Sequence, residues 1–369
     1  MISLPFLIIR QLFKSYGEAA ALADFDLAVA RGAFHAVVGT EAVSRWALLQ
    51  LIAGFEAPDS GQIILDGKDL GLKAPGQRGV MTIPRNLALF PHLTVRQNIG
   101  YPLQQRHLSA AEIAARVVKQ AEIAHLGMKL LDQHPPELSP IDRLRVALAR
   151  ALIAEPHVLL LDAPVDALAG AERKQALSEI KEMHRAAGVT VVLAGPDLAE
   201  AMTLADRVTV LQDGRDVQTA APNDIYYRPG NAFIAMLSGD NNLLPIDVED
   251  VLPESVVFRC AAIQPANGTL PRTHVHANLA KGRNWMMVRP ELVRLYLGIR
   301  RFDCQLEGEI VERFHRGPML QLRIKAPGLD QPLIVDVPTP PPAPVDIGRR
   351  VTLGWNRADT YLLPREDRP

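Results

Sequence analysis

The sequence contains only two cysteines, Cys260 and Cys304, among its 369 residues. Two thiols exclude a framework of several disulfides, so we expect two reduced thiols in a cytoplasmic protein. Long hydrophobic runs are also missing, since no stretch holds 18 uncharged apolar residues. The apolar N-terminal stretch has no basic residue before it and is interpreted as a first strand, not as a signal peptide. Direct membrane insertion is therefore not expected.

An excess of charge of one sign is absent as well. The formal net charge is −1, which removes the electrostatic argument for nucleic acid or an anionic membrane surface as a partner. Hydrophobic residues make up 48% and charged residues 22% of the chain. This composition predicts a globular protein, and the length is enough for two or three domains with a sizeable core.

Apolar runs and helical patterns alternate over the first two thirds of the chain. Buried strands are predicted at 158–161, 189–193 and 208–211, and helices at 109–126, 143–153, 171–187 and 198–205. Strands that alternate with helices indicate an α/β fold with a mostly parallel sheet.

The residue pattern and composition change after residue 237. Helical periodicity fades, prolines become frequent, and short strand-like runs appear, with a proline-rich connector at 338–344. We therefore expect an α/β domain over residues 1–237 and a small all-β barrel domain over residues 238–369.

A loop between a strand and a helix stands where a phosphate-binding loop, G-x-x-x-x-G-K-[ST], is expected. The eight positions are residues 39–46, and the first is Gly39, as in the motif. At the last three positions, Ser44 replaces the second glycine, Arg45 replaces the lysine and Trp46 replaces the serine or threonine. In such a loop the backbone amides and the lysine hold phosphates, and the hydroxyl binds Mg²⁺. Glu41 adds a negative charge to it, and Trp46 offers a metal no lone pair.

Several passages together resemble the ATP-binding subunit of ABC transporters, in particular bacterial importer subunits for maltose-like sugars, polyamines, sulfate or iron. These passages are residues 48–70, 87–99, 145–162, 200–215, 223–244, 288–291, 308–317 and 348–363. The resemblance implies a P-loop-NTPase-like ATPase domain with a parallel sheet, an antiparallel β subdomain and a helical subdomain. An OB- or TOBE-like accessory barrel is expected to follow it.

Other positions that face the nucleotide in this family also differ here. Arg85 replaces the glutamine of the glutamine loop, Ala163 replaces the glutamate after the Walker B aspartate, and Pro196 replaces the switch histidine. The signature motif, usually LSGGQ, reads Leu138 and then Ser139, Pro140, Ile141 and Asp142. Pro140 has no N–H to donate, and Asp142 adds a negative charge.

Three family positions keep their residues. Tyr16 matches the aromatic residue on which adenine stacks, Gly39 begins the phosphate loop, and Asp162 ends the Walker B strand. We interpret them as vestigial, with Tyr16 a half-buried strand residue and Asp162 a strand-end cap. No metal site is expected.

These substitutions predict a catalytically inactive importer-type protein, a pseudo-ATPase that is not an enzyme and has no cofactor. We expect it to keep the fold, with a homodimer and a transmembrane permease subunit as candidate partners. Docking on the permease would use the surface near residues 88–95, at the inner face of the membrane.

Two alternatives stay open. In the first alternative, the chain would be a functional ATP-hydrolysing importer subunit in which Arg45 reaches phosphate in place of lysine, with ATP and Mg²⁺ as ligands. In the second alternative, it would sense a small molecule through residues 238–369.

Overall fold

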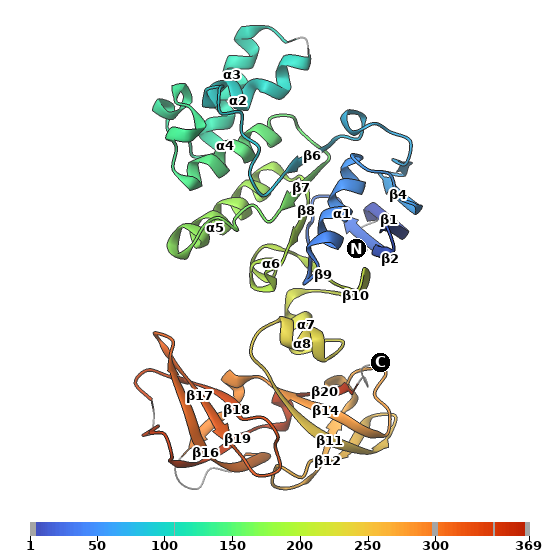
Figure 1. The fold of residues 1–369 in the computed structure, drawn as a ribbon, viewed down its shortest axis with the longest axis vertical. Helices are drawn as coiled ribbons and strands as arrows, with labels where there is room; N and C mark the ends of the chain where they lie inside the picture. Colours follow the sequence, from blue (N-terminus) through green and yellow to red (C-terminus); the bar gives the residue numbers. More distant parts are fainter. Residues whose placement is uncertain (1–4, 107, 297–301, 342–343, 366–369) are drawn as a thin grey trace. The chain divides into compact units, whose positions relative to one another are not determined.

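The computed structural model describes residues 5–106, 108–296, 302–341 and 344–365 (Figure 1). Contacts divide the chain into two compact units, residues 1–222 and residues 223–369. The sequence places its boundary later, after residue 237, and that boundary stays a proposal, because contacts group 223–237 with the second unit. The expected α/β architecture followed by an all-β domain is confirmed.

A six-stranded sheet forms the centre of the first unit, in the order β10-β9-β3-β8-β7-β6. Its members are β3 (Phe34–Gly39), β6 (Val80–Ile83), β7 (Val158–Asp162), β8 (Thr190–Gly195), β9 (Arg207–Gln212) and β10 (Arg215–Ala220). All neighbours are parallel except β10, which pairs antiparallel with β9 at one edge. The central strands β3, β7 and β8 are almost entirely buried and mostly apolar, as expected for strands covered on both faces.

A smaller antiparallel sheet has the order β2-β1-β4-β5. Its strands are β1 (Pro5–Tyr16), β2 (Ala19–Ala30), β4 (Ser60–Leu65) and β5 (Lys68–Asp69). Helix α1 (Ala42–Ala53) shares one hydrophobic core with this sheet and with β7, formed by residues such as Leu7, Phe25, Leu48 and Leu160. The core fixes the start of α1 at the carboxyl edge of β3.

Figure 1 shows a helical part around α2, α3 and α4 within the first unit. The α-helices of this unit are α1, α2 (Val95–Gly100), α3 (Ala110–Ile123), α4 (Pro140–Leu152), α5 (Gly170–Ala187) and α6 (Leu198–Leu204). Short 3₁₀ helices are η1 (Pro75–Gln77), η2 (Tyr101–Arg106), η3 (Met128–Asp132) and η4 (Pro135–Glu137). None of the helices over the described ranges is long and apolar enough to cross a membrane.

Helix α4 begins three residues before the predicted start at residue 143. Ser139 is its N-cap, because its side chain accepts a hydrogen bond from the backbone N–H of Asp142. Pro140 occupies the first helical position, where a missing N–H costs nothing. The unusual signature residues are therefore compatible with a well-formed helix start.

The second unit begins with α7 (Pro222–Tyr227) and α8 (Ala232–Leu237) and continues as two antiparallel five-stranded sheets. One sheet contains β11 (Asn242–Val251), β12 (Ser255–Arg259), β13 (Asn267–Pro271), β14 (Gly282–Val288) and β20 (Thr360–Pro364). The other contains β15 (Arg294–Tyr296), β16 (Cys304–His315), β17 (Met319–Lys325), β18 (Leu333–Pro338) and β19 (Arg350–Trp355). The 3₁₀ helices are η5 (Arg272–His274), η6 (Pro290–Leu292) and η7 (Arg357–Asp359).

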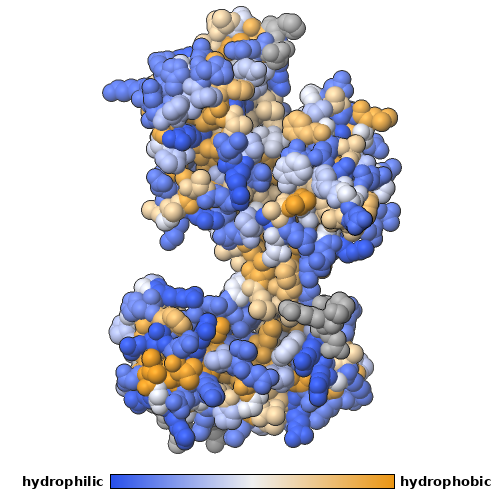
Figure 2. Space-filling model, in the orientation of Figure 1, coloured by the Kyte–Doolittle hydropathy of each residue, from blue (hydrophilic) through white to orange (hydrophobic). Residues whose placement is uncertain are grey.

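One core cluster joins the two sheets of the second unit, and it includes the fully buried Trp355 and both free cysteines. Arg289 ties the short helices to this core. Its guanidinium is buried and donates hydrogen bonds to the backbone oxygens of Tyr226 and Ala235 and to Ser238 Oγ. On the face in Figure 2, hydrophilic residues cover most of each unit and exposed apolar residues are scattered. Residues 342 and 343 of the expected proline-rich connector lie outside the described residues.

Candidate nucleotide site

The carboxyl edge of the parallel sheet gathers most of the substituted family positions. Arg45 follows β3, Arg85 follows β6, Ala163 follows β7 and Pro196 follows β8. Ligands of open α/β sheets bind at this edge, beyond the carboxyl ends of the strands. The structure therefore brings together residues that are far apart in the sequence, around Asp162 at the end of β7.

The loop after β3 is short because α1 starts early. Glu41 is the N-cap and α1 begins at Ala42, so Ser44, Arg45 and Trp46 are already helical. The amides of the first turn of a helix have no intrahelical partners and form a positive end that attracts anions. A phosphate bound at this edge would therefore contact the amides of the first turn of α1. In a typical phosphate loop it would instead contact the amides of a wide glycine-rich loop.

Gly39 is required by packing at the end of β3. A Cβ atom at this position would lie 2.3 Å from the carbonyl oxygen of Leu211 on the neighbouring strand β9. The glycine that begins the phosphate-loop pattern is thus explained by a close backbone contact, whether or not the loop holds a ligand.

Glu41 is hydrogen-bonded within the protein. Its carboxylate accepts a hydrogen bond from Ser44 Oγ at 2.8 Å and another from the backbone N–H of Asp213 at 3.1 Å. It links the first turn of α1 to the turn between β9 and β10. A negative charge therefore lies beside the amides that would bind phosphate.

Arg45 is buried, with 8% of its surface exposed, and its Nη1 donates to the carbonyl oxygen of Gly39. Burial lowers the pKa of Arg45, and the carboxylate of Asp162 opposes that shift. Burial likewise raises the pKa of Asp162, and Arg85 and Arg45 oppose that shift. The two guanidinium groups and the Asp162 carboxylate thus form one electrostatic cluster.

Arg85 forms an ion pair with Asp166, in the turn that follows β7. The backbone of Arg85 also acts to lower the pKa of Asp162. The sequence indicates Arg85 as a substitution but not its partner, which lies 81 residues further along the chain.

Trp46 and Tyr16 form an aromatic pair, with ring centroids 6.0 Å apart and planes tilted by 45°. The Tyr16 hydroxyl donates to Glu56, and Lys14 Nζ lies 5.5 Å from the ring centroid. Burial and the carboxylate of Glu56 raise the pKa of Tyr16 to about 12. Trp46 is 42% exposed, so this pair offers an accessible aromatic surface.

Ala163 and Pro196 carry no side-chain chemistry at this edge. Ala163 is buried, and its N–H donates to the carbonyl oxygen of Ala194 on β8 at 2.9 Å. Pro196 is exposed and precedes Asp197, the N-cap of α6. The carboxylates of Asp162 and Asp166 follow the same strand, β7, at this edge.

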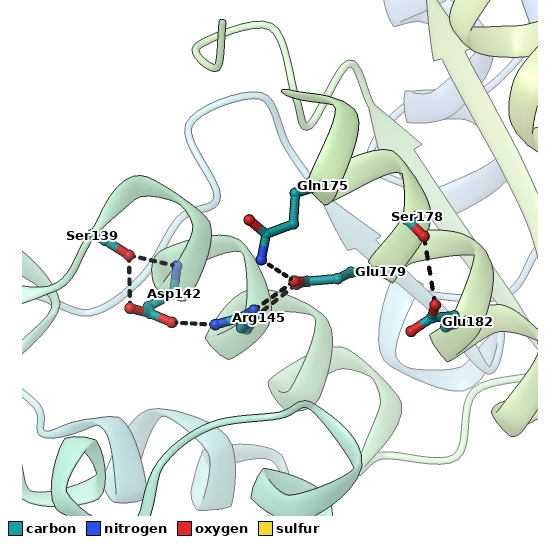
Figure 3. A network of polar contacts seen from close by, with 7 residues as sticks. All are labelled: Ser139, Asp142, Arg145, Gln175, Ser178, Glu179 and Glu182. Atoms are coloured by element: carbon teal, nitrogen blue, oxygen red, sulfur yellow. Dashed lines mark hydrogen bonds and ion pairs between the residues drawn. The ribbon is translucent and has the colours of Figure 1, made fainter. Parts of the chain in front are cut away.

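The signature residues belong to a separate polar cluster between α4 and α5. Figure 3 shows Ser139 and Asp142 at the start of α4, with Asp142 joined to Arg145 and Arg145 joined to Glu179 on α5. Ile141, the remaining substituted signature residue, is buried. The Arg145 Nη1 to Asp142 Oδ1 distance is 2.7 Å, so the charge added by Asp142 is paired within the chain.

Comparisons with known proteins identify both units. The family model of the ABC transporter matches residues 22–166, and that of the TOBE domain matches residues 286–363. The spermidine/putrescine import ATP-binding protein PotA of Methylococcus capsulatus is 34% identical over 365 residues, which cover 97% of this chain and 92% of that protein. The Fe(3+) ions import ATP-binding protein FbpC of Mesorhizobium japonicum is 36% identical over 330 residues, 87% of each chain.

Solved structures agree with the fold of the first unit. CbiO1 from Clostridium perfringens aligns with a TM-score of 0.56 at 25% identity, over 60% of this chain and 91% of that chain. A dimeric ATP-binding cassette in a post-hydrolysis state, bound to ADP and Pi, aligns with a TM-score of 0.52 at 24% identity, over 58% of this chain and 98% of that chain.

These comparisons correct one prediction from the sequence. The expectation that the chain is not an enzyme is wrong, because it is homologous over nearly its full length to ATP-binding import proteins of an ATP-hydrolysing family. The comparisons give no support to the pseudo-ATPase interpretation, and the substituted positions alone do not establish a loss of activity. The chain belongs to the ABC transporter family, as an ATP-binding subunit of the importer type with a C-terminal TOBE domain.

Proposed function

We propose that this chain is the ATP-binding and ATP-hydrolysing subunit of an ABC solute importer, with an unusual set of residues at its nucleotide site. The observation that carries the proposal is Arg45, a cation buried at the position of the phosphate-loop lysine, beside Asp162. An arginine can hold phosphate oxygens through two parallel hydrogen bonds. The positive end of α1 supports the same ligand.

The aromatic pair supplies a place for the nucleobase. Tyr16 lies at the position where the family stacks adenine, and Trp46 adds a second ring beside it. Aromatic faces bind bases by stacking, whatever hydrogen bonds the base forms. We propose that adenine binds against Trp46 and Tyr16 while Arg45 holds the phosphates.

The residues fit the triphosphate better than they fit Mg²⁺. Mg²⁺ prefers six oxygen ligands, usually one or two carboxylates plus phosphates and water. At the family's metal-facing positions this chain offers the carboxylate of Asp162, while Trp46 and Arg85 offer no oxygen from their side chains.

As partners we propose a second copy of this chain and a transmembrane permease subunit at the inner face of the membrane. Relatives are named as import proteins for spermidine and putrescine or for Fe(3+) ions, so the solute class we propose is a small cation.

The segment 88–95 is the proposed docking surface for the permease subunit. Arg150 holds it in place by donating to the carbonyl oxygens of Leu87 and Ala88 at 2.9 and 2.8 Å.

Calorimetric titration of the full chain with Mg-ATP tests the proposal, together with a phosphate-release assay on the same preparation. We expect the wild-type chain to bind ATP and Arg45→Ala to lose binding by at least about tenfold, since it removes a charge-assisted hydrogen-bond donor. Arg10→Ala, an exposed arginine on β1, is the matched control and should bind like the wild type. Absence of ATP binding by the wild-type chain would refute the proposed function.

A further inference from the structure

Two arginines flank the carboxylate that would hold a metal ion. The charges of Arg45 on α1 and of Arg85 after β6 both act on Asp162, while the guanidinium groups themselves bond to the carbonyl oxygen of Gly39 and to Asp166. The parallel pairing of β6 with β7, with Ile83 opposite Leu161, fixes this segment close to the end of β7. Two positive charges therefore act on Asp162, and the carboxylate of Asp166, which pairs with Arg85, opposes them.

Arginine side chains at these positions oppose a divalent cation. A Mg²⁺ ion bound to Asp162 would lie near two permanent positive charges, and Asp162 would have to leave its interactions with them. Arg85 stands in place of a glutamine, whose carbonyl oxygen can face a metal, and Trp46 stands in place of a hydroxyl. Of these two positions that lose an oxygen ligand, the one at Arg85 also gains a cation.

The arginines are arranged to meet phosphate instead. Arg45 is buried and lies directly after the loop, while the Arg85 side chain is 60% exposed and accessible to a ligand. Its ion pair with Asp166 holds the guanidinium at the sheet edge. Guanidinium groups bind phosphate oxygens with fixed geometry and keep their charge at every physiological pH.

We propose that Arg45 and Arg85 neutralise the phosphates of the nucleotide in place of Mg²⁺, so that this site binds ATP without the metal. This inference rests on the proposed function. In this proposal, the two arginine side chains supply the positive charge that Mg²⁺ usually brings to the phosphates. Asp166 is the positioning residue that keeps Arg85 at the site.

Calorimetry with free ATP in EDTA, compared with ATP in excess MgCl₂, tests the inference on the full wild-type chain. We expect the affinity in EDTA to equal or exceed the affinity with Mg²⁺. Binding that appears only with Mg²⁺ would overturn the inference and leave the proposed function standing. Binding under neither condition would overturn both.

Variants of Arg85 give an independent readout. Arg85→Gln should weaken binding of ATP in EDTA by at least about tenfold, and Arg85→Lys should recover part of the loss because it keeps the charge. Arg116→Gln, an exposed arginine paired with Glu155 on the helical part, should bind like the wild type. Thermal melting establishes that each variant is folded. Wild-type affinity in a folded Arg85→Gln variant would overturn the inference.

Discussion

The carboxylate of Glu41 accepts a hydrogen bond from the backbone N–H of Asp213, 3.1 Å away, and thereby joins the start of α1 to the turn between β9 and β10. The same carboxylate accepts a hydrogen bond from Ser44 Oγ. Glu41 thus places a fixed negative charge beside the first turn of α1, where a phosphate would also bind. It is the one feature of this loop that opposes an anionic ligand.

Removal of that charge should strengthen phosphate binding. We expect Glu41→Gln to bind ATP about tenfold or more tightly than the wild type, because like charges at short range repel strongly at a partly buried site. Adenosine, which has no phosphate, should bind both forms equally. Calorimetry measures both ligands, and Glu122→Gln on the exposed side of α3 is the control for loss of one negative charge. Equal ATP affinities would contradict this role for Glu41.

Gly39 should contribute to the free energy of unfolding even when no nucleotide is bound. Gly39→Ala would place a methyl group 2.3 Å from the carbonyl oxygen of Leu211, a contact that only a backbone shift can relieve. We expect a loss of about 1–3 kcal/mol in the free energy of unfolding, as for other overpacked sites. Urea denaturation measures it. Gly76→Ala is the control, because its added Cβ would contact nothing within 4 Å.

The sequence predicts the elements of the fold well where the apolar runs are long. The buried runs at 158–161 and 189–193 became β7 and β8, and the pattern at 171–187 became α5 with one added residue. The start of α4 was missed because Pro140 was interpreted as damage to the signature motif. In the structure Pro140 is a good first residue of a helix, after the Ser139 N-cap.

The site was predicted only in part, since its pairs join distant segments. Position-by-position comparison identifies Arg45 and Arg85 as substitutions, but it cannot show that both approach Asp162 or that Arg85 pairs with Asp166. The prediction of inactivity treats the substituted groups as a unit whose losses do not add, and expects their joint effect to leave no meaningful hydrolysis. It weighs the charge of each substituted residue separately and does not include the ion pair of Arg85 with Asp166.

The pair Arg145 and Glu179 should matter for folding of the first unit. Arg145 donates from Nε and Nη2 to the two carboxylate oxygens of Glu179, and both side chains are at least four-fifths buried (Figure 3). Removal of one partner leaves an unpaired buried charge. We expect Arg145→Ala to lose about 3 kcal/mol of unfolding free energy.

The control for this prediction lies on α5, next to Glu179. Ser178→Ala removes an exposed contact to Glu182 at 3.5 Å and should change stability by less than about 0.5 kcal/mol. The double variant Arg145→Met with Glu179→Leu should be more stable than Arg145→Ala, because it removes both charges together. Urea denaturation compares all three. Equal losses in the double variant and in Arg145→Ala would show that packing, not the unpaired charge, sets the cost.

His35 should make the stability of the first unit depend on pH. Its ring is 1% exposed and lies on β3 with Nε2 2.8 Å from Thr209 Oγ1. Burial, followed by the charge of Arg207, lowers the pKa of His35 to about 4, and Asp206 opposes the shift. Below pH 6.5 the unfolded chain gains a proton at His35 that the folded chain does not. The unfolding free energy therefore falls by about 3 kcal/mol between pH 6.5 and pH 4, and this contribution levels off below pH 4.

Other groups also titrate in this range, so the difference between the wild type and His35→Asn isolates the contribution of the histidine. We expect the variant to be less stable at pH 7 but to lack this part of the slope, and parallel pH profiles would contradict the assignment.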